Sequence, residues 1–131
     1  MPSKIETIMT ADESGAELVA FAKQKAEILA KNITRTQIRN IFSEVRQIEA
    51  AWPSSEARQR LTMLKPKLSY QRARIRRGDK DFQLNLENVL SDAIDSVNEA
   101  KNDETRDYRF NRFVDLFEAI LAYHRAAGGR N

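Results

Sequence analysis

The sequence predicts an all-α protein that folds as a compact bundle of about five helices. Apolar residues recur at spacings of three and four in four or five segments, as they do on the buried face of a helix. Alternating apolar and polar runs, which are typical of strands, are nearly absent, and there is no Asn-Gly or Asp-Gly hairpin turn. We expect a flexible segment over residues 1–10 and a single helical domain over residues 11–131, which is long enough to bury one core.

The first two predicted helices each begin at a capping box. Thr10 with Glu13 opens a helix that we expect to reach about Lys31. Its apolar residues are Leu18, Phe21, Ala22, Ile28 and Leu29. Thr34, with a glutamine three residues later, opens a second helix that Pro53 ends. Its apolar residues are Ile38, Ile41, Phe42, Val45, Ile48 and Trp52.

The third predicted helix contains a proline. Ser54 or Ser55 caps its beginning, and Gly78 ends it. Its apolar residues keep one helical phase through Pro66; they are Ala57, Leu61, Leu64, Leu68 and Ile75. Because proline lacks a backbone N–H and clashes with the preceding turn, we expect this helix to be kinked or broken near Pro66.

Two more helices complete the predicted bundle. Asp79 or Asp81 opens the fourth. Its apolar residues are Phe82, Leu86, Val89, Leu90, Ala93, Ile94 and Val97. A polar joint at residues 101–103 precedes the fifth helix, which the pair Gly128 and Gly129 ends. The apolar residues of this last helix are Phe110, Phe113, Val114, Phe117, Ile120 and Leu121.

Residues suited to catalysis or cofactor binding are scarce. Cysteine is absent, and the four glycines form neither a Walker loop nor a dinucleotide fingerprint. His124 lacks the arginine partner of helical ribonucleases, so we interpret it as a helix-end histidine, packed or facing the C-terminal dipole. We predict no catalytic residue, no bound metal, no cofactor and no small-molecule substrate, and we carry His124 as a candidate subunit contact.

Acidic residues lie along one side of the fourth predicted helix. They are Asp92, Asp95, Glu99 and Asp103. Three interpretations of these residues are open: a solvated face, a contact for a basic partner, or a site for a divalent cation. A cation site would need carboxylates from several helices. We take Asp92, Asp95 and Glu99 as candidate subunit-contact residues.

A basic segment between Arg58 and Arg77 is the feature that points most clearly to function. It holds six arginines and two lysines with no acid, so the rest of the chain carries a net charge of −5, because the whole chain carries only +3. Helical phase places the cations in two stripes that flank the apolar row. One stripe is Arg58, Lys65, Arg72 and Arg76, and the other is Arg60, Lys67 and Arg74.

Two interpretations of the basic segment remain open. Its cations border a buried helix face and pair with the acidic fourth helix, or they bind a polyanion. Arginine suits forked contacts to phosphate, and Tyr70 is either a stacking ring for a base or a side chain packed against the bundle. The balance of charge favours polyanion binding.

Three motifs resemble the small-subunit family of the Csm (type III-A) CRISPR-Cas interference complex, over roughly residues 34 to 129. They are Gln37-Ile38-Arg39 leading into Ile41-Phe42, then Leu64-Lys65-Pro66-Lys67-Leu68-Ser69-Tyr70, and finally Phe113 through Tyr123-His124 with Gly128-Gly129. The family more usually has arginine where Lys65 stands and alanine at Ser69. The resemblance implies a compact, non-catalytic helical bundle, several copies of which stack along the guide RNA and its target RNA.

The sequence therefore predicts a cytoplasmic RNA-binding structural subunit of a ribonucleoprotein, with no membrane segment. We expect it to contact guide RNA and target RNA, other subunits of the complex and copies of itself. The candidate RNA-binding residues are Arg39, Lys65, Lys67, Tyr70, Arg72 and Arg76. The alternative is a helical adaptor that binds an acidic protein without RNA; a helical nuclease is a remote third.

Overall fold

The computed structural model describes residues 4–30, 33–73 and 80–128, and the side chains of these residues except 71–73 and 80–85. Six helices appear in chain order: α1 (Lys4–Thr10), α2 (Ala16–Leu29), α3 (Arg35–Ala51), α4 (Ser55–Ala73), α5 (Lys80–Asn98) and α6 (Asp103–Ala126). The described residues contain no strand, so the predicted all-α class is confirmed. None of the described helices combines the length and apolar character that crossing a membrane requires.

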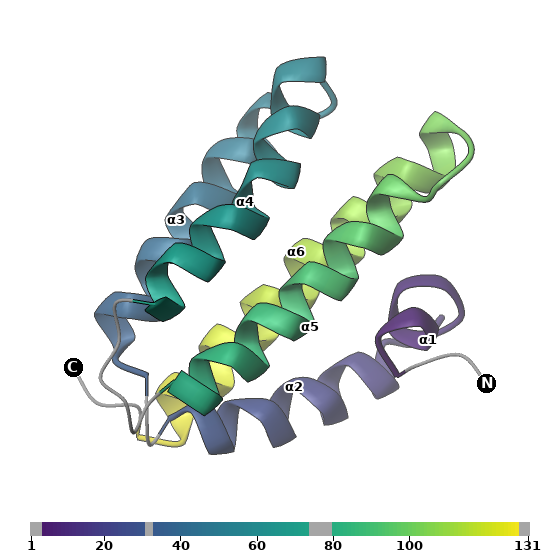
Figure 1. The fold of residues 1–131 in the computed structure, drawn as a ribbon. Helices are drawn as coiled ribbons and strands as arrows, with labels where there is room; N and C mark the ends of the chain where they lie inside the picture. The colour runs from purple at the N-terminus through teal and green to yellow at the C-terminus, as the bar shows by residue number, and fades with distance from the viewer. Residues whose placement is uncertain (1–3, 31–32, 74–79, 129–131) are drawn as a thin grey trace.

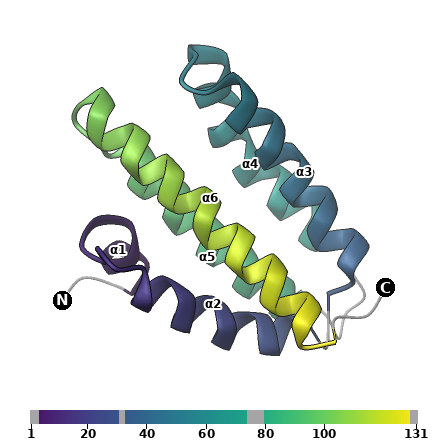
Figure 2. The same cartoon turned by 180° about the vertical axis from the view of Figure 1, so that it is seen from behind.

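Two helical hairpins make up most of the bundle. Figure 1 shows α3 and α4 running side by side next to the pair α5 and α6. Helix α4 packs on α5, and α3 packs on α6. Helix α2 lies on the other side of the second hairpin and packs mainly on α6, as Figure 2 shows from behind. One cluster of buried apolar side chains draws on all six helices.

The N-terminal region differs from the prediction. Where we expected a flexible segment over residues 1–10, residues 4–10 form α1, which packs on α5 and α6. The side chains of Ile5, Ile8 and Met9 are buried, because spacings of three and four put them on one face of a helix. Helix α1 is therefore the sixth element that the count of about five helices missed.

The start of α2 is also corrected. The predicted capping box between Thr10 and Glu13 does not open it, since α2 begins at Ala16. The buried carboxylate of Asp12 accepts hydrogen bonds from the backbone N–H of Glu17 (3.2 Å) and of Leu18 (2.9 Å). Gly15 adopts φ = +80°, a conformation that residues with a Cβ rarely take, so it allows the turn before α2.

The side chain of Arg112, on α6, anchors this turn to the rest of the bundle. Its Nε donates to the carbonyl of Ile8 (3.1 Å), and its Nη2 donates to the carbonyl of Asp12 (3.0 Å) and to Asp12 Oδ2 (2.9 Å). One partly buried guanidinium therefore satisfies backbone and carboxylate acceptors between α1 and α2.

Helix α3 begins and ends as predicted. Gln37 N–H donates to Thr34 Oγ1 (3.1 Å), and Thr34 N–H donates to Gln37 Oε1 (2.8 Å), which completes the capping box. The helix ends at Ala51, just before Trp52 and Pro53. The Trp52 ring stacks on Phe110 of α6, with centroids 3.8 Å apart. This contact fixes the end of α3 against the second hairpin.

Helix α4 is continuous through Pro66. The predicted alternative of a break there is therefore wrong, while a kink at this residue stays a prediction. Ser54 is the residue that caps the helix, because its Oγ accepts from Ala57 N–H (3.1 Å). The predicted apolar residues Ala57, Leu61, Leu64 and Leu68 are all buried, and Ile75 lies outside the described residues. Burial of this row offsets the backbone hydrogen bond that proline cannot make.

The second hairpin follows the predicted pattern. Helix α5 begins at Lys80, and Asp79 lies outside the described residues. Asn102 caps α6, since its Oδ1 accepts from Thr105 N–H (2.8 Å). Gly128, at φ = +82°, follows the end of α6. The predicted apolar face of α6 is buried from Phe110 to Ile120.

Candidate nucleic-acid interface

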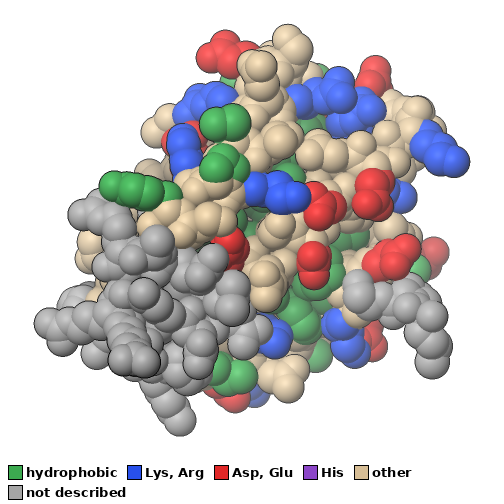
Figure 3. All heavy atoms as spheres, in the orientation of Figure 1, with side chains coloured by type: hydrophobic (Ala, Val, Ile, Leu, Met, Phe, Trp, Pro, Cys, Tyr) green, Lys and Arg blue, Asp and Glu red, His purple; other side chains and the backbone are tan. Residues whose placement is uncertain are grey.

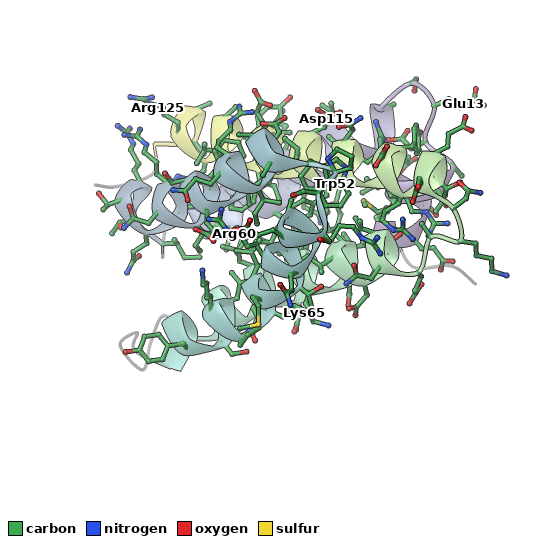
Figure 4. The ribbon with its side chains drawn as sticks, turned by 90° about the horizontal axis from the view of Figure 1, so that it is seen from above. Glu13, Trp52, Arg60, Lys65, Asp115 and Arg125 are labelled. Carbon is green, nitrogen blue, oxygen red and sulfur yellow. The ribbon has the colours of Figure 1, made fainter. Side chains whose placement is uncertain are left out.

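Helix α4 carries cations on two sides, as its helical phase predicted. Arg60 and Lys67 lie beside α3, whereas Lys65 lies beside α5. Figure 4 shows Arg60 and Lys65 on opposite sides of α4. The row of buried apolar residues separates the two sides, because it faces the core. We call the exposed face that includes Lys65, Lys67 and Tyr70 the α4 basic surface.

Two cations of α4, Arg60 and Lys67, share one carboxylate from α3. Glu44 Oε1 lies 3.1 Å from Arg60 Nη2 and 3.0 Å from Lys67 Nζ. Burial by itself would raise the pKa of Glu44, but the hydrogen bonds and charges of Lys67 and Arg60 outweigh it and hold this pKa below its ordinary value. Glu44 is therefore ionised at neutral pH and offsets part of the local positive charge.

A second carboxylate, from α5, pairs with the other side. Lys65 Nζ lies 2.5 Å from Asp95 Oδ1. The expectation of eight uncompensated cations is therefore wrong for Arg60, Lys65 and Lys67, because the fold brings acids from α3 and α5 beside an acid-free segment. The plainer interpretation, in which the cations pair with the acidic helix, is confirmed for Lys65.

Pairing does not remove these cations from the surface. The side chain of Lys67 remains 57% exposed and that of Lys65 remains 36% exposed. Tyr70 is 63% exposed, so its ring does not pack inside the bundle. Arg72 belongs to the last turn of α4, but its side chain and the whole of Arg76 lie outside the described residues.

The acidic candidates lie along a separate groove. Asp92, Asp95 and Glu99 line a space of about 530 Å³ between α5 and α1, where Glu6 adds a fourth carboxylate. In Figure 3, Asp and Glu side chains gather over the α5 part of the visible face. Within the described part of the chain, no group of three or more His, Asp or Glu side chains is placed to hold a metal ion.

His124 is not a surface residue. Its side chain is 1% exposed, and its Nε2 lies 2.7 Å from the carbonyl oxygen of Ile33, so this nitrogen carries the proton and donates. The packed histidine that we weighed from the sequence is thus confirmed. Its role as a candidate subunit contact is corrected, because a buried imidazole cannot reach a neighbouring protein.

A third surface feature, which the sequence did not reveal, is a groove between α3 and α6, hereafter the α3–α6 groove. Its volume is about 550 Å³, and its lining includes Arg35, Arg39 and Arg46 of α3 and Arg125 of α6. Figure 2 shows these two helices side by side, and Figure 4 labels Arg125 at the end of α6. Of these arginines, sequence reasoning had selected only Arg39.

The other arginines of the groove do not stand next to one another in the sequence, so no single run of charge reveals them. Arg35, Arg39 and Arg46 stand four and seven residues apart, which places them on one side of a helix. Arg125 joins them only when α6 packs on α3. A search for runs of like charge along the chain therefore finds α4 and misses this groove.

Arg46 is more constrained than its neighbours in the α3–α6 groove. Its guanidinium contacts Glu49 (2.7 Å) and Glu118 (3.5 Å) and lies over the Phe42 ring, 4.7 Å from the centroid. The hydrogen bond to Glu49 contributes most to raising the pKa of Arg46. These contacts hold Arg46 at one end of the groove as a fixed, paired cation.

Comparison with known proteins identifies the family. The family model described as Csm2 type III-A matches residues 12–130, which is nearly the whole chain. The chain belongs to the Csm2 type III-A family. No curated protein and no solved structure matches the chain significantly. Csm2 is a structural subunit of the Csm complex of type III-A CRISPR-Cas systems, so the chain is a component of that complex and associates with its other subunits.

The three motifs that resemble this family come from different helices. Residues 37–39 lie on α3, residues 64–70 on α4, and residues 113–124 on α6. The last motif is mostly core, because its phenylalanines and His124 are buried. The first two contribute the exposed residues Arg39, Lys67 and Tyr70. Arg39, Lys67 and Tyr70 therefore lie on two helices, α3 and α4, that pack against each other.

Proposed function

We propose that the chain is a non-catalytic subunit that binds the RNA backbone inside the type III-A effector complex. The observation that supports this most directly is the placement of Arg39 and Lys67, both in family motifs and both exposed, on the packed helices α3 and α4. Phosphates that cross these helices meet cations from each. Arg72 and Arg76 remain candidate RNA contacts from the sequence, because the side chain of Arg72 and all of Arg76 lie outside the described residues.

The proposed contacts position RNA without reading its sequence. Lysine and arginine bind phosphate oxygens, which every nucleotide presents, and base pairing between guide and target supplies the specificity. Tyr70 offers an exposed ring on which a base can stack whatever its identity. To bind a phosphate, Lys65 must release Asp95 and Lys67 must release Glu44. We therefore expect one copy of the chain to bind RNA with modest affinity.

Several copies stacked along the guide RNA–target RNA duplex would join such surfaces into one track. Head-to-tail stacking needs two complementary patches on one molecule. The groove lined by Asp92 and Glu99 carries negative charge, and the α4 basic surface carries positive charge. Reversing the charges of Asp92 and Glu99 should lower the copy number of this subunit in the purified complex, measured by native mass spectrometry. An unchanged copy number would show that the acidic groove and the α4 basic surface do not hold neighbouring copies together.

The test of RNA binding is the salt dependence of affinity. If about four phosphates are contacted on single-stranded RNA, log Kd should change with log salt with a slope of magnitude about 3. Replacing both Arg39 and Lys67 by alanine should lower that magnitude to about 1.5, because each lost phosphate contact removes about 0.7. Lys23→Ala, at an exposed lysine on α2, is the matched control and should leave the slope unchanged.

Two results would contradict the proposal. Affinity that does not respond to salt would mean that phosphates are not the ligand. A chain that binds no RNA, yet keeps its place in the complex after nuclease treatment, would favour a protein adaptor instead.

A further inference from the structure

The α3–α6 groove combines an apolar floor with a cationic rim. Ile38 and Phe42 of α3 and Leu121 of α6 line it, together with the arginines. Its volume of about 550 Å³ lies within the range of sites that hold one small organic ligand, which run from roughly 300 to 1,000 Å³. The groove is therefore large enough to accept a planar ring and one charged group.

Three of the groove's four arginines keep their charge available. Glu118 is the carboxylate in the lining, and it pairs with Arg46 at 3.5 Å. Arg35, Arg39 and Arg125 make no ion pair with any residue that the structure describes. The groove thus carries a local excess of positive charge that no carboxylate in the described part of the chain neutralises.

Two buried hydrogen-bonding groups of residues in the groove wall also lack partners within the described part of the chain. Arg35 Nε and His124 Nδ1 are both buried, and neither has a hydrogen-bond partner among residues 4–30, 33–73 and 80–128. The other ring nitrogen of His124, Nε2, already donates to the carbonyl oxygen of Ile33. Buried polar atoms are normally satisfied, but these two are closed to solvent, so a ligand in the groove does not reach them unless the groove wall shifts.

We propose that the α3–α6 groove holds one unpaired nucleotide of RNA. Its base lies on the floor made by Ile38, Phe42 and Leu121, and its phosphate contacts Arg39 and Arg125. RNA suits such a site because unpaired bases can turn away from the strand and pack on aromatic or guanidinium planes. The inference rests on the proposed function and names a second part of the RNA that the chain contacts.

Two features favour a nucleotide over an acidic protein segment. Every cation in the lining is an arginine, whose planar fork matches phosphate and lies flat on a base. Arg39 also belongs to the proposed backbone contacts, so the groove continues from that surface rather than standing apart from it. An acidic peptide could pair with the same arginines, but its binding would not explain why the groove adjoins the proposed RNA contacts through Arg39.

The experiment compares two RNAs with the full chain. One is a short uridine RNA, and the other has the same ribose–phosphate backbone without bases; binding is followed by fluorescence anisotropy at fixed salt. We expect the base-free RNA to bind about tenfold more weakly, because packing one base contributes on that order. Ala122→Trp, which fills the groove from α6, should weaken uridine RNA binding and so narrow the difference between the two RNAs.

Controls separate the groove from other base contacts. Ala126→Trp fills the same groove from one turn further along α6 and should act like Ala122→Trp, so a folding defect in one variant, seen by thermal unfolding, does not end the test. Tyr70→Ala removes the other ring proposed to contact a base, so the difference between the two RNAs should shrink but remain, and adding Ala122→Trp to this variant should abolish it.

Each contrary result has a distinct meaning. Equal binding of the two RNAs by the natural chain would overturn the nucleotide site and leave the proposed backbone function standing. A base preference that survives both tryptophan variants but disappears in Tyr70→Ala would move the base to α4 and overturn the proposal. Binding of a polyglutamate peptide that Ala122→Trp blocks, with equal RNA affinities, would assign the groove to a protein segment. Failure to bind either RNA would refute the backbone function itself.

Discussion

Glu44 shows how one residue can both stabilise the fold and limit function. Its carboxylate joins α3 to α4 through Arg60 and Lys67, and Lys67 is one of the cations that we propose bind RNA. An RNA phosphate that binds Lys67 must compete with this carboxylate. The charge that RNA meets is therefore smaller than the sequence of α4 alone would suggest.

Replacing Glu44 by glutamine should raise RNA affinity about two- to fivefold, because a competing exposed ion pair is worth up to about 1 kcal/mol. The free energy of unfolding should fall by about 1 kcal/mol or less, since both pairs with α4 are lost. Anisotropy titrations and urea unfolding measure the two effects. Glu27→Gln, at an exposed position on α2, makes the same charge change away from α4 and should affect neither. Weaker RNA binding by Glu44→Gln would mean that the carboxylate positions the cations rather than competing for them.

Asp12 should make stability depend on acid pH. Burial raises the pKa of this carboxyl, but hydrogen bonds from the backbone of Leu18 and Glu17 and the Arg112 charge outweigh it, so the pKa lies below 3.8. The ionised form therefore adds stability that is fully present above pH 3.8 and is lost as pH falls through the lowered pKa. Asp12→Asn should be less stable than the natural chain at neutral pH, and the difference should shrink in acid.

Asp115 provides a control, because its pKa is shifted in the direction opposite to that of Asp12. Asp115 is exposed, but partial desolvation is the main cause that raises its pKa above the ordinary value, so its ionised form is slightly disfavoured in the folded protein. Asp115→Asn should therefore leave the thermal unfolding temperature at neutral pH unchanged or higher. A loss of stability in both asparagine variants would contradict the opposite directions of the pKa shifts of Asp12 and Asp115.

At the scale of the elements, amphipathic spacing predicted the four longest helices well, while local capping signals were unreliable. The Thr34 box exists because an apolar helix face follows it directly. The similar signature at Thr10 fails, because residues 4–10 already form a helix that ends there. Pro66 was ambiguous for a comparable reason: whether a helix continues through proline depends on burial of its face in the folded core, which the local sequence does not contain.

Thr34→Ala tests the one capping box that the structure retains. It removes the side-chain acceptor for the N–H of Gln37, and N-cap losses of this kind cost about 1 kcal/mol. Thr36→Ala makes the same change at an exposed position inside α3 and should cost nothing measurable. Urea unfolding of the two variants compares them directly, and equal stabilities would show that the box does not hold the start of α3.

At the scale of the whole molecule, function depends on surfaces that no single helix carries. The family and Arg39 could be predicted from motifs because these are local in sequence. The partners of Lys65 and Lys67, the burial of His124 and the α3–α6 groove arise only when helices distant in sequence pack together. Charge counted along the chain therefore identified a basic segment correctly but overestimated its free charge.

If RNA crosses α3 and α4, ultraviolet cross-linking of the purified effector complex detects the contact most directly. Peptides of this subunit that become attached to RNA are identified by mass spectrometry. We predict attachment within residues 35–51 and 55–73, with Tyr70 among the modified residues, and none on the exposed face of α2. Attachment confined to α2, or no attachment to this subunit while other subunits are modified, would contradict the account.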